Sequence, residues 1–311
     1  MTTAEAYTVC RAIAKREAKN FYYAFRVLPQ HKRDAMCAVY AFMRRADDIA
    51  DDESTPIAER RIVMHQWIES WRKARHTGVS DDPVFVALND TQKQFSIPDA
   101  LLEELVEGTT MDLAPRPEQQ AQVQTYADFE ELYRYCYLVA SVVGLVCIKI
   151  FGYSDLRAEQ LAEETGIAFQ LTNILRDIKE DVERSRVYLP LDRMAAHSVS
   201  VERIQELAAG AEMTSSDRAL LEELAAKAEH YYGSASELTP LIDPDSRAAL
   251  WVLAMIYYDL LMRIRKKKYD VFSTRVSVPT TGKLVLLLRG ALMAMRNRRA
   301  SVRTRTSAMC W

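Results

Sequence analysis

The segment that decides the fold is a charged, amide-bearing stretch in the second half of the chain, Gln170-Leu171-Thr172-Asn173-Ile174-Leu175-Arg176-Asp177-Ile178-Lys179-Glu180-Asp181. It lies in a proline-free run from Glu118 to Leu189, so nothing in it interrupts a helix. In helical register, one stripe carries Gly166, Gln170, Asn173, Asp177 and Asp181. Apolar residues flank that stripe on both sides. The pattern predicts a helix that lines an apolar cavity with one charged end.

A second acidic segment lies 130 positions earlier, and it reads Arg44-Arg45-Ala46-Asp47-Asp48-Ile49-Ala50-Asp51-Asp52. Its helical stripe carries Tyr40, Arg44, Asp47 and Asp51, which selects this aspartate pair over the equally spaced Asp48 and Asp52. Two carboxylates four residues apart share one helical face and repel each other unless a cation lies between them. Oxygen ligands suit Mg²⁺, with Mn²⁺ as an alternative, and Mg²⁺ takes further ligands from substrate phosphates. Two facing helices of this kind predict a metal-diphosphate site, whereas the alternative for each is a solvated acidic face.

The composition predicts one all-α domain over residues 1–311. The chain is 49% hydrophobic and 27% charged, as in ordinary soluble proteins. Strand alternation, hairpin turn signals and a linker between domains are absent. Neither a GxGxxG nor a P-loop pattern occurs, which disfavours NADPH. Five cysteines without paired spacing predict neither a disulfide framework nor a zinc site.

Proline positions and apolar periodicity predict twelve helices. They span residues 4–18, 21–27, 31–52, 57–76, 83–95, 98–108, 126–151, 155–182, 200–209, 216–238, 246–269 and 282–300. The most apolar run, Tyr137 to Phe151, is too short for a membrane span and contains Ser141 and Lys149. The expected compartment is therefore the cytoplasm.

The C-terminal tail is strongly basic, with thirteen basic residues and one acidic residue from Arg263 onward. Within it, the segment from Lys283 to Arg299 combines leucines with arginines and predicts a basic amphipathic helix. Because aromatic residues do not interleave with its charges, the segment fits an anionic membrane surface better than nucleic acid. We therefore expect no nucleic-acid partner, and peripheral contact of the tail, about 283–311, with the inner membrane surface. The alternative is a packed terminal helix with a basic end.

The same residues carry a resemblance to a known family over almost the whole chain. The matching blocks are Lys19 to Phe25, Ala38 to Asp51, Gly166 to Asp181, Arg186 to Pro190 and Tyr269 to Phe272. In these blocks the chain resembles the squalene and phytoene synthases, which join two isoprenoid diphosphates head to head. It departs from the family pattern at Asn20, where serine is usual, and at Glu17, where histidine is frequent.

The resemblance implies an all-α isoprenoid-synthase fold around a central apolar cavity, with prenyl diphosphates as substrates. The implied metal ligands are Asp47, Asp51, Asn173, Asp177 and Asp181. The implied catalytic residues are Tyr40, Arg44 and these four aspartates, with Tyr40 as a candidate base. The implied substrate-binding residues are Asn20, Phe21, Phe25, Gln170, Asn173, Arg176, Arg186, Tyr188, Tyr257 and Arg275. Reductive family members also lack a dinucleotide fingerprint, so NADPH stays an open cofactor.

Several functions remain open at this point. The bulky Phe25 and the block Asn20-Phe21-Tyr22-Tyr23 favour one reaction, in which two farnesyl diphosphates are coupled to presqualene diphosphate and then converted to squalene. The small Cys37 argues for the alternative, two geranylgeranyl diphosphates coupled to phytoene. Another class I terpene enzyme would lack the amide-acid stripe followed by Arg186. A non-catalytic helical scaffold would be expected to have lost its aspartates, and all four are present.

Overall fold

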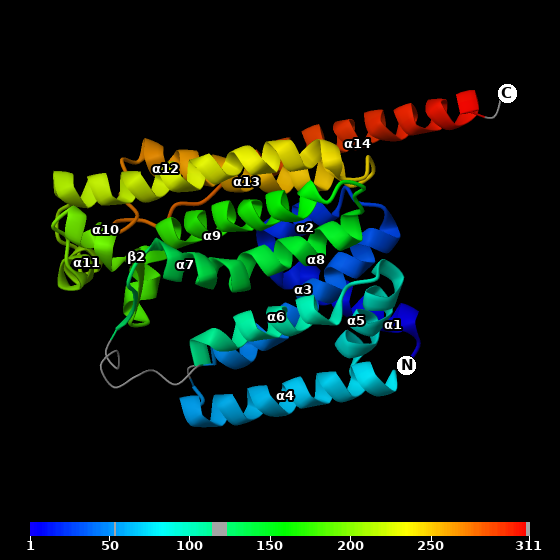
Figure 1. Ribbon diagram of the computed structural model, residues 1–311, viewed down its shortest axis with the longest axis horizontal. Helices are drawn as coiled ribbons and strands as arrows, with labels where there is room; N and C mark the ends of the chain where they lie inside the picture. Colours follow the sequence, from blue (N-terminus) through cyan, green and yellow to red (C-terminus); the bar gives the residue numbers. More distant parts are fainter. Residues whose placement is uncertain (53, 114–122, 309–311) are drawn as a thin grey trace.

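The structure is a computed structural model that describes the chain except for residues 53, 114–122 and 309–311. Side chains are also not described at residues 19, 20, 112 and 296–308. Helices dominate the described residues, as the sequence predicts (Figure 1). In chain order they are α1 (Thr3–Glu17), α2 (Lys19–Phe25), α3 (Gln30–Ala50), α4 (Ile57–Thr77), α5 (Pro83–Phe95), α6 (Asp99–Thr110), η1 (Met111–Leu113), α7 (Phe129–Cys136), η3 (Tyr137–Ser141), α8 (Val142–Phe151), α9 (Arg157–Glu183), α10 (Leu191–Ala196), α11 (Val201–Ala208), α12 (Ser215–Leu238), η4 (Thr239–Leu241), α13 (Arg247–Lys266) and α14 (Thr280–Ala308).

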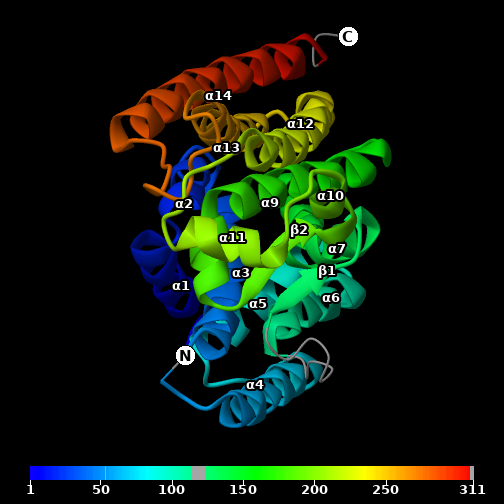
Figure 2. The same ribbon diagram turned by 90° about the vertical axis from the view of Figure 1, so that its left-hand side faces the viewer.

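The long helices run along the long axis of the molecule in stacked layers. Figure 1 shows α12, α13 and α14 in the uppermost layer, α9 and α8 below them, and α6 and α4 at the bottom. The end-on view in Figure 2 places α14 and α4 on opposite sides of the molecule. Helix α9 lies at the centre, where it packs against α12, α13 and α8. This arrangement leaves the face of α9 that carries the amides and acids directed into the interior.

Local sequence signals explain where several helices begin. Thr2 and Thr214 each cap a helix through a capping box, in which the hydroxyl and the acid three residues later satisfy end N–H groups reciprocally. Asp82 accepts a hydrogen bond from Val84 N at 2.8 Å, and Pro83 occupies the first turn of α5. At the end of α4, Gly78 adopts φ +71°, the left-handed conformation that terminates a helix.

Two short strands correct the expectation of a chain without strands. Strand β1 (Gln124–Tyr126) pairs in parallel with β2 (Arg186–Pro190), which directly follows α9. No alternation of apolar and polar residues predicts β1, because a three-residue strand is too short to show such a pattern. The short helix α10 after β2 was also not predicted. The pair fixes the path of the chain as it leaves the second acidic segment.

The helix from Phe129 to Phe151 is continuous and contains a π-helical segment, η3. With 23 residues it is long and apolar enough to cross a membrane, contrary to the sequence expectation, and 56% of its most apolar window is buried inside the protein. Gly166 of α9 explains part of its packing, since a Cβ there would lie 2.6 Å from the Ser141 Cα. The burial and this close contact identify the segment as a core helix that packs against α9.

Candidate active site

Two connected chambers lie between the helices of the core. The polar chamber, of about 400 Å³, contains both predicted aspartate pairs in its wall. The apolar chamber, of about 380 Å³, extends from the same region toward Phe151, Leu238 and Leu250. Five residues line both chambers and so mark their junction: Met43, Asp47, Val139, Gln170 and Asn173. The two helical stripes predicted from the sequence therefore run along one continuous space.

The stripe on α3 divides between the chambers. Tyr40 and Arg44 line the apolar chamber, Asp51 lines the polar chamber, and Asp47 lines both. Among the described residues, Asp48 and Asp52 line neither chamber. Asp48 instead pairs with Arg44, and Asp52 accepts hydrogen bonds from the turn that follows α3. The geometry thus agrees with the choice of Asp47 and Asp51 made from the sequence.

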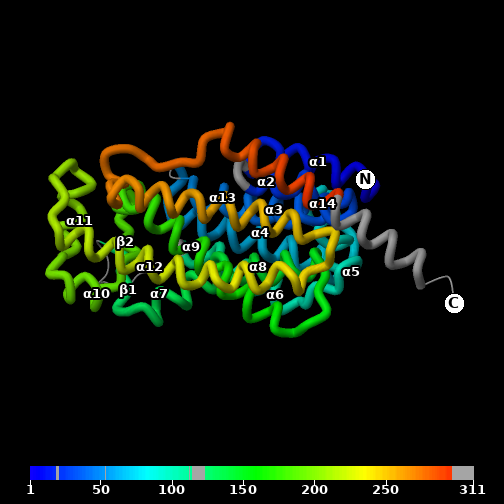
Figure 3. Tube along the Cα trace, turned by 90° about the horizontal axis from the view of Figure 1, so that it is seen from above, coloured from blue at the N-terminus to red at the C-terminus, as the bar shows by residue number. Residues whose placement is uncertain are grey.

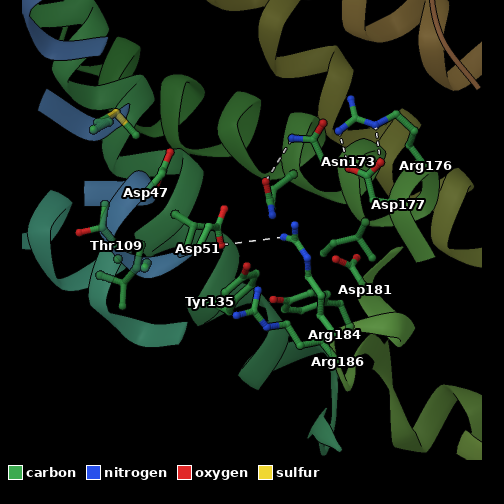
Figure 4. A pocket seen from close by; sticks show the side chains of 18 of the residues that line it. Asp47, Asp51, Thr109, Tyr135, Asn173, Arg176, Asp177, Asp181, Arg184 and Arg186 are labelled. Atoms are coloured by element: carbon green, nitrogen blue, oxygen red, sulfur yellow. Dashed lines mark hydrogen bonds and ion pairs between the residues drawn. The ribbon is translucent and has the colours of Figure 1, made fainter. Parts of the chain in front are cut away.

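Asp177, the fourth residue of the stripe on α9, is a carboxylate that two arginines neutralise. Arg176 Nε donates a hydrogen bond to Asp177 Oδ1 at 2.7 Å, and Arg275 Nη2 donates to the same oxygen at 2.8 Å (Figure 4 shows the Arg176 pair). Burial alone would raise the pKa of Asp177, but the hydrogen bond and charge of Arg176, and then the charge of Arg275, hold that pKa below its usual range. Asp177 is therefore ionised at neutral pH, the form that a metal ligand requires.

The two aspartate pairs face each other across the polar chamber, as Figure 4 shows. In the part of the chain that the structure describes, no three His, Cys, Asp or Glu side chains converge into a ready metal site. Arg184, at the end of α9, lies between the two acidic segments and pairs with Asp51. A cation bound here would take ligands from more than one helix and from its substrate.

Unsatisfied polar atoms test whether these residues fit Mg²⁺ and a diphosphate. Asn173 Oδ1 is buried and has no hydrogen-bond partner among the described residues, although its amide nitrogen donates to Gln170 Oε1 at 3.3 Å. Arg44 Nε, a donor at the junction side of the apolar chamber, is likewise buried without a partner. Leaving such atoms unpaired costs about 1–3 kcal/mol each. Asn173 Oδ1 can serve as an oxygen ligand for a metal, and Arg44 Nε can donate a hydrogen bond to a phosphate oxygen. These atoms therefore fit both Mg²⁺ and a diphosphate.

Aromatic rings surround the inner side of the junction. The Phe21 ring lies 6.4 Å from that of Tyr40, 6.0 Å from that of Tyr257 and 6.5 Å from that of Phe25, measured between centroids. All four line the apolar chamber. Burial raises the pKa of Tyr40 to about 12, so its hydroxyl is neutral at physiological pH. If Tyr40 is the base, its neutral hydroxyl oxygen accepts the proton, because the phenolate is not present at this pH.

The remaining predicted binding residues lie at the polar chamber, with two exceptions. Arg176, Arg186 and Tyr188 line it, and Tyr188 also stacks on Tyr135 with centroids 4.8 Å apart. Arg275 belongs to the segment after α13 and reaches the site only through Asp177 and Glu180. The side chain of Asn20 lies outside the described part of the structure.

The prediction that Cys37 leaves room for a longer prenyl chain is wrong. Its side chain is fully buried, but it lines neither chamber, whereas Met36 and Tyr40 on the same helix do. Helical spacing placed Cys37 near the cavity-facing stripe but could not show that its face packs into the core. It therefore gives no room for a longer prenyl chain.

Sequence reasoning missed three residues of the site. Phe169 lines the apolar chamber and stacks on Tyr257 at 4.6 Å. Tyr135 contributes to the polar chamber from α7. Arg184, at the end of α9, continues the polar stripe three residues after Asp181, so its spacing was a usable signal.

Comparison with known proteins identifies the family of the chain. Residues 14–281 match the family model described as squalene/phytoene synthase. The phytoene synthase of Mycobacterium tuberculosis is 36% identical over 88% of this chain and 86% of its own length. The 15-cis-phytoene synthase of Synechococcus elongatus is 33% identical over 91% of each.

Solved structures give the same fold. A dehydrosqualene synthase crystallised with a ligand superposes with a TM-score of 0.80 at 31% identity, covering 93% of this chain and 96% of its own. The squalene synthase HpnC of Alicyclobacillus acidocaldarius has a TM-score of 0.74 at 24% identity, covering 86% and 95%. The chain therefore has the all-α terpenoid synthase fold and belongs to the squalene/phytoene synthase family of prenyltransferases.

Proposed function

We propose that this enzyme couples two geranylgeranyl diphosphates head to head into phytoene, in a reaction that depends on Mg²⁺. The choice of the twenty-carbon substrate rests on the relatives named phytoene synthase, which are 32–36% identical over most of their length. It reverses the preference for farnesyl diphosphate that the sequence alone favoured. With Cys37 outside the cavity wall, neither preference rests on that residue.

One observation carries the coupling chemistry: a polar chamber with two acidic stripes opens directly into an apolar chamber. A prenyl diphosphate has the same division into a charged head and an apolar tail. The wall of the apolar chamber follows α9 from Asn173 back to Ala162, eleven residues, or about 16 Å of helix. Gly144 of α8 and Gly166 of α9 also line this chamber, and the lack of side chains at these positions lets α8 and η3 pack closely against α9.

Asp47, Asp51, Asn173, Asp177 and Asp181 would hold the metal ions. Bound Mg²⁺ supplies stabilisation of the negative charge that develops on the leaving diphosphate. The protein adds its own cations to this end of the space. Arg176, Arg184 and Arg186 all line the polar chamber and would attract and orient diphosphate oxygens.

The apolar chamber would protect the reacting carbons from water. An allylic cation forms there when the carbon–oxygen bond breaks, and hydroxide or water would capture it. The faces of Phe21, Tyr40 and Tyr257 can stabilise cationic carbon through their ring electrons. The neutral Tyr40 hydroxyl, near the junction, is positioned to accept or relay the proton that the coupled product loses.

Coupling of two farnesyl diphosphates is the second candidate function. Its support is the side chain of Phe25, which lines the apolar chamber while only 2% of it is exposed. A phenyl ring at this position shortens the space available to a tail. The similarity to a dehydrosqualene synthase at 31% identity points in the same direction.

A competition assay tests the proposal. Purified enzyme and Mg²⁺ receive equal amounts of farnesyl and geranylgeranyl diphosphate, with and without NADPH, and products are identified by mass. We expect forty-carbon hydrocarbon to predominate without NADPH. Predominance of thirty-carbon products would overturn the chain length, and absence of diphosphate release from either substrate would overturn the enzymatic function.

A further inference from the structure

We propose that the outer face of α14 docks the enzyme on an anionic lipid bilayer. This outer face consists of Leu284, Val285, Leu288, Leu292 and Met295. After the adjacent pair Leu284 and Val285, the positions follow at intervals of three or four residues, so all five form one stripe along the helix. The sequence predicted a basic amphipathic helix in this segment, and the structure adds which of its faces is uncovered.

The inner face of α14 is already occupied. Leu286 and Ala294 are buried, and α14 packs against α13. Gly290 allows close approach at this contact, because a Cβ there would lie 2.3 Å from the Val252 Cγ2. The exposed leucines therefore belong to a second, separate face, and packing against the described residues does not account for them.

The outer face concentrates exposed apolar surface. Leu288 is 65% exposed, Leu292 57% and Met295 50%. Of the thirteen large apolar side chains that are exposed in the described part of the chain, five lie in these twelve positions of α14. A cluster of this kind, unlike single exposed leucines, marks an interaction surface. Figures 2 and 3 show α14 running obliquely to α13 at the outside of the molecule, where a planar partner can reach it.

The positive charge of α14 indicates an anionic partner for its outer face. The segment of α14 contains seven basic residues and no acidic residue, in a chain whose net charge is −2. Leucines flanked by lysine and arginine suit a bilayer that combines an apolar interior with anionic headgroups. Lys283 and Arg289 flank the described stripe directly. The same excess of positive charge disfavours pairing of this face with itself in a second copy of the chain.

The docking surface also lies close to the apolar chamber. Val252 of α13 contacts α14, and the next residue, Leu253, lines that chamber. A bilayer on the outer face would therefore be separated from the chamber by α14 and the wall of α13. If the proposed function holds, this location suits an enzyme that releases a water-insoluble hydrocarbon. Docking on vesicles is measured without prenyl diphosphate. A failure of bilayer docking can therefore be distinguished from a failure of the proposed coupling reaction.

Flotation of the full-length protein with vesicles tests the proposal. One set of vesicles contains phosphatidylcholine alone and the other contains phosphatidylcholine with phosphatidylglycerol. We expect binding to the anionic set, at least about tenfold weaker binding to the neutral set, and loss of binding at high salt. The triple variant Leu284→Asn, Leu288→Asn, Leu292→Asn should bind the anionic set about tenfold more weakly.

A matched control changes three apolar residues elsewhere that are 57–79% exposed: Ile62→Asn, Val79→Asn and Leu156→Asn. This control should bind vesicles as the unaltered protein does. A second variant, Arg296→Gln, Arg298→Gln, Arg299→Gln, keeps every leucine and should also weaken binding to anionic vesicles. Circular dichroism of each variant checks that the fold is retained.

Three results would overturn the proposal. One is equal binding of the unaltered protein and the leucine variant to anionic vesicles. Another is equal binding of the unaltered protein to both vesicle types. The third is a dimer, seen by sedimentation equilibrium without vesicle binding, that the leucine variant dissociates, because the outer face would then contact a second copy of the chain.

Discussion

Arg184 Nη1 lies 3.9 Å from Asp51 Oδ1, across the polar chamber from the end of α9 to the end of α3 (Figure 4). The two side chains are 48% and 46% exposed, so the pair contributes little stability by itself. Its significance is its location, since it joins the two acidic segments at the point where they face each other. A cationic side chain between the two acidic segments shows that this space favours positive charge.

The first prediction concerns Asp51. We expect Asp51→Asn to lower turnover at least about a hundredfold, equivalent to about 2.7 kcal/mol of transition-state stabilisation, while the fold stays intact. The amide keeps the shape of the carboxylate but removes the charge that a divalent cation requires. Steady-state kinetics at saturating Mg²⁺ measures the effect. Asp52→Asn is the matched control, because this neighbour accepts hydrogen bonds from Ser54 and Thr55 outside the chamber. Near-normal turnover of Asp51→Asn would show that Asp51 is a surface charge.

The second prediction separates binding from chemistry. Inorganic diphosphate and Mg²⁺ together should raise the melting temperature, since a ligand at a hundred times its dissociation constant stabilises the folded state by about 2.7 kcal/mol. Neither component alone should have a comparable effect, because the four aspartates repel diphosphate in the absence of metal. Differential scanning fluorimetry measures the shift. In Asp177→Asn the joint shift should disappear, and its persistence would place the metal site elsewhere.

The third prediction tests the contact between α9 and the π-helical segment η3. A Cβ on Gly166 would lie 2.6 Å from the Ser141 Cα and 2.7 Å from its nitrogen, and backbone atoms cannot move aside as a flexible side chain can. Gly166→Ala should therefore lower the free energy of unfolding by about 2–3 kcal/mol. Gly233→Ala on α12 is the control, because no atom of the described residues lies within 4 Å of the added methyl group. It should stabilise the protein by up to about 1 kcal/mol, as Ala replaces Gly in a helix. Urea unfolding of both variants and of the unaltered protein measures these changes in the free energy of unfolding.

Helical periodicity explains how much of the fold and site could be predicted from the sequence. All twelve predicted helices are present, and both polar stripes line the chambers, because spacing alone determines which residues of one helix share a face. Spacing does not determine which faces of different helices meet. Cys37 was misplaced for this reason.

Other parts of the site needed tertiary information. Phe169 lies among the apolar residues beside the stripe on α9, where core and cavity residues look alike in sequence. The pairing of β1 with β2 joins segments about sixty residues apart and has no local signal. Arg275 could also not be predicted as a partner of Asp177, because it lies in a segment without regular secondary structure, 98 residues away in sequence.

The fourth prediction concerns pH and stability at Asp217. Its side chain is 2% exposed and accepts hydrogen bonds from Arg203 Nη2 at 2.9 Å and Thr214 N at 2.7 Å. Burial raises the pKa of this carboxyl, but the bonds from Arg203 and Thr214 outweigh burial and lower the pKa below 3.8. Because the folded-state pKa lies below the unfolded value, this stabilisation is complete at neutral pH and is lost as the pH falls through the folded pKa.

Asp217→Asn should therefore lower the free energy of unfolding by about 2–4 kcal/mol at pH 7. The gap between variant and unaltered protein should narrow below pH 3.8. Glu206→Gln is the control, since Glu206 contacts the same arginine at 3.0 Å but is 62% exposed. A gap that stays constant down to acid pH would show that packing, and not the charge of Asp217, stabilises this corner.

The last prediction addresses the length of the prenyl chain. Phe25 is buried, lines the apolar chamber and contacts Phe21, so its ring limits the space beside the junction. Phe25→Ala should raise the share of forty-carbon product in the competition assay, because each additional methylene that finds apolar surroundings contributes about 0.8 kcal/mol. Removing the ring also costs about 3–5 kcal/mol of stability, so Phe25→Leu serves as a milder variant that should shift the product ratio in the same direction. Phe95→Ala is the control, since this ring stacks on His31 and lines neither chamber. If both Phe25 variants remain folded and active but leave the product ratio unchanged, chain length is set by the far end of the chamber, at Phe151 and Leu250.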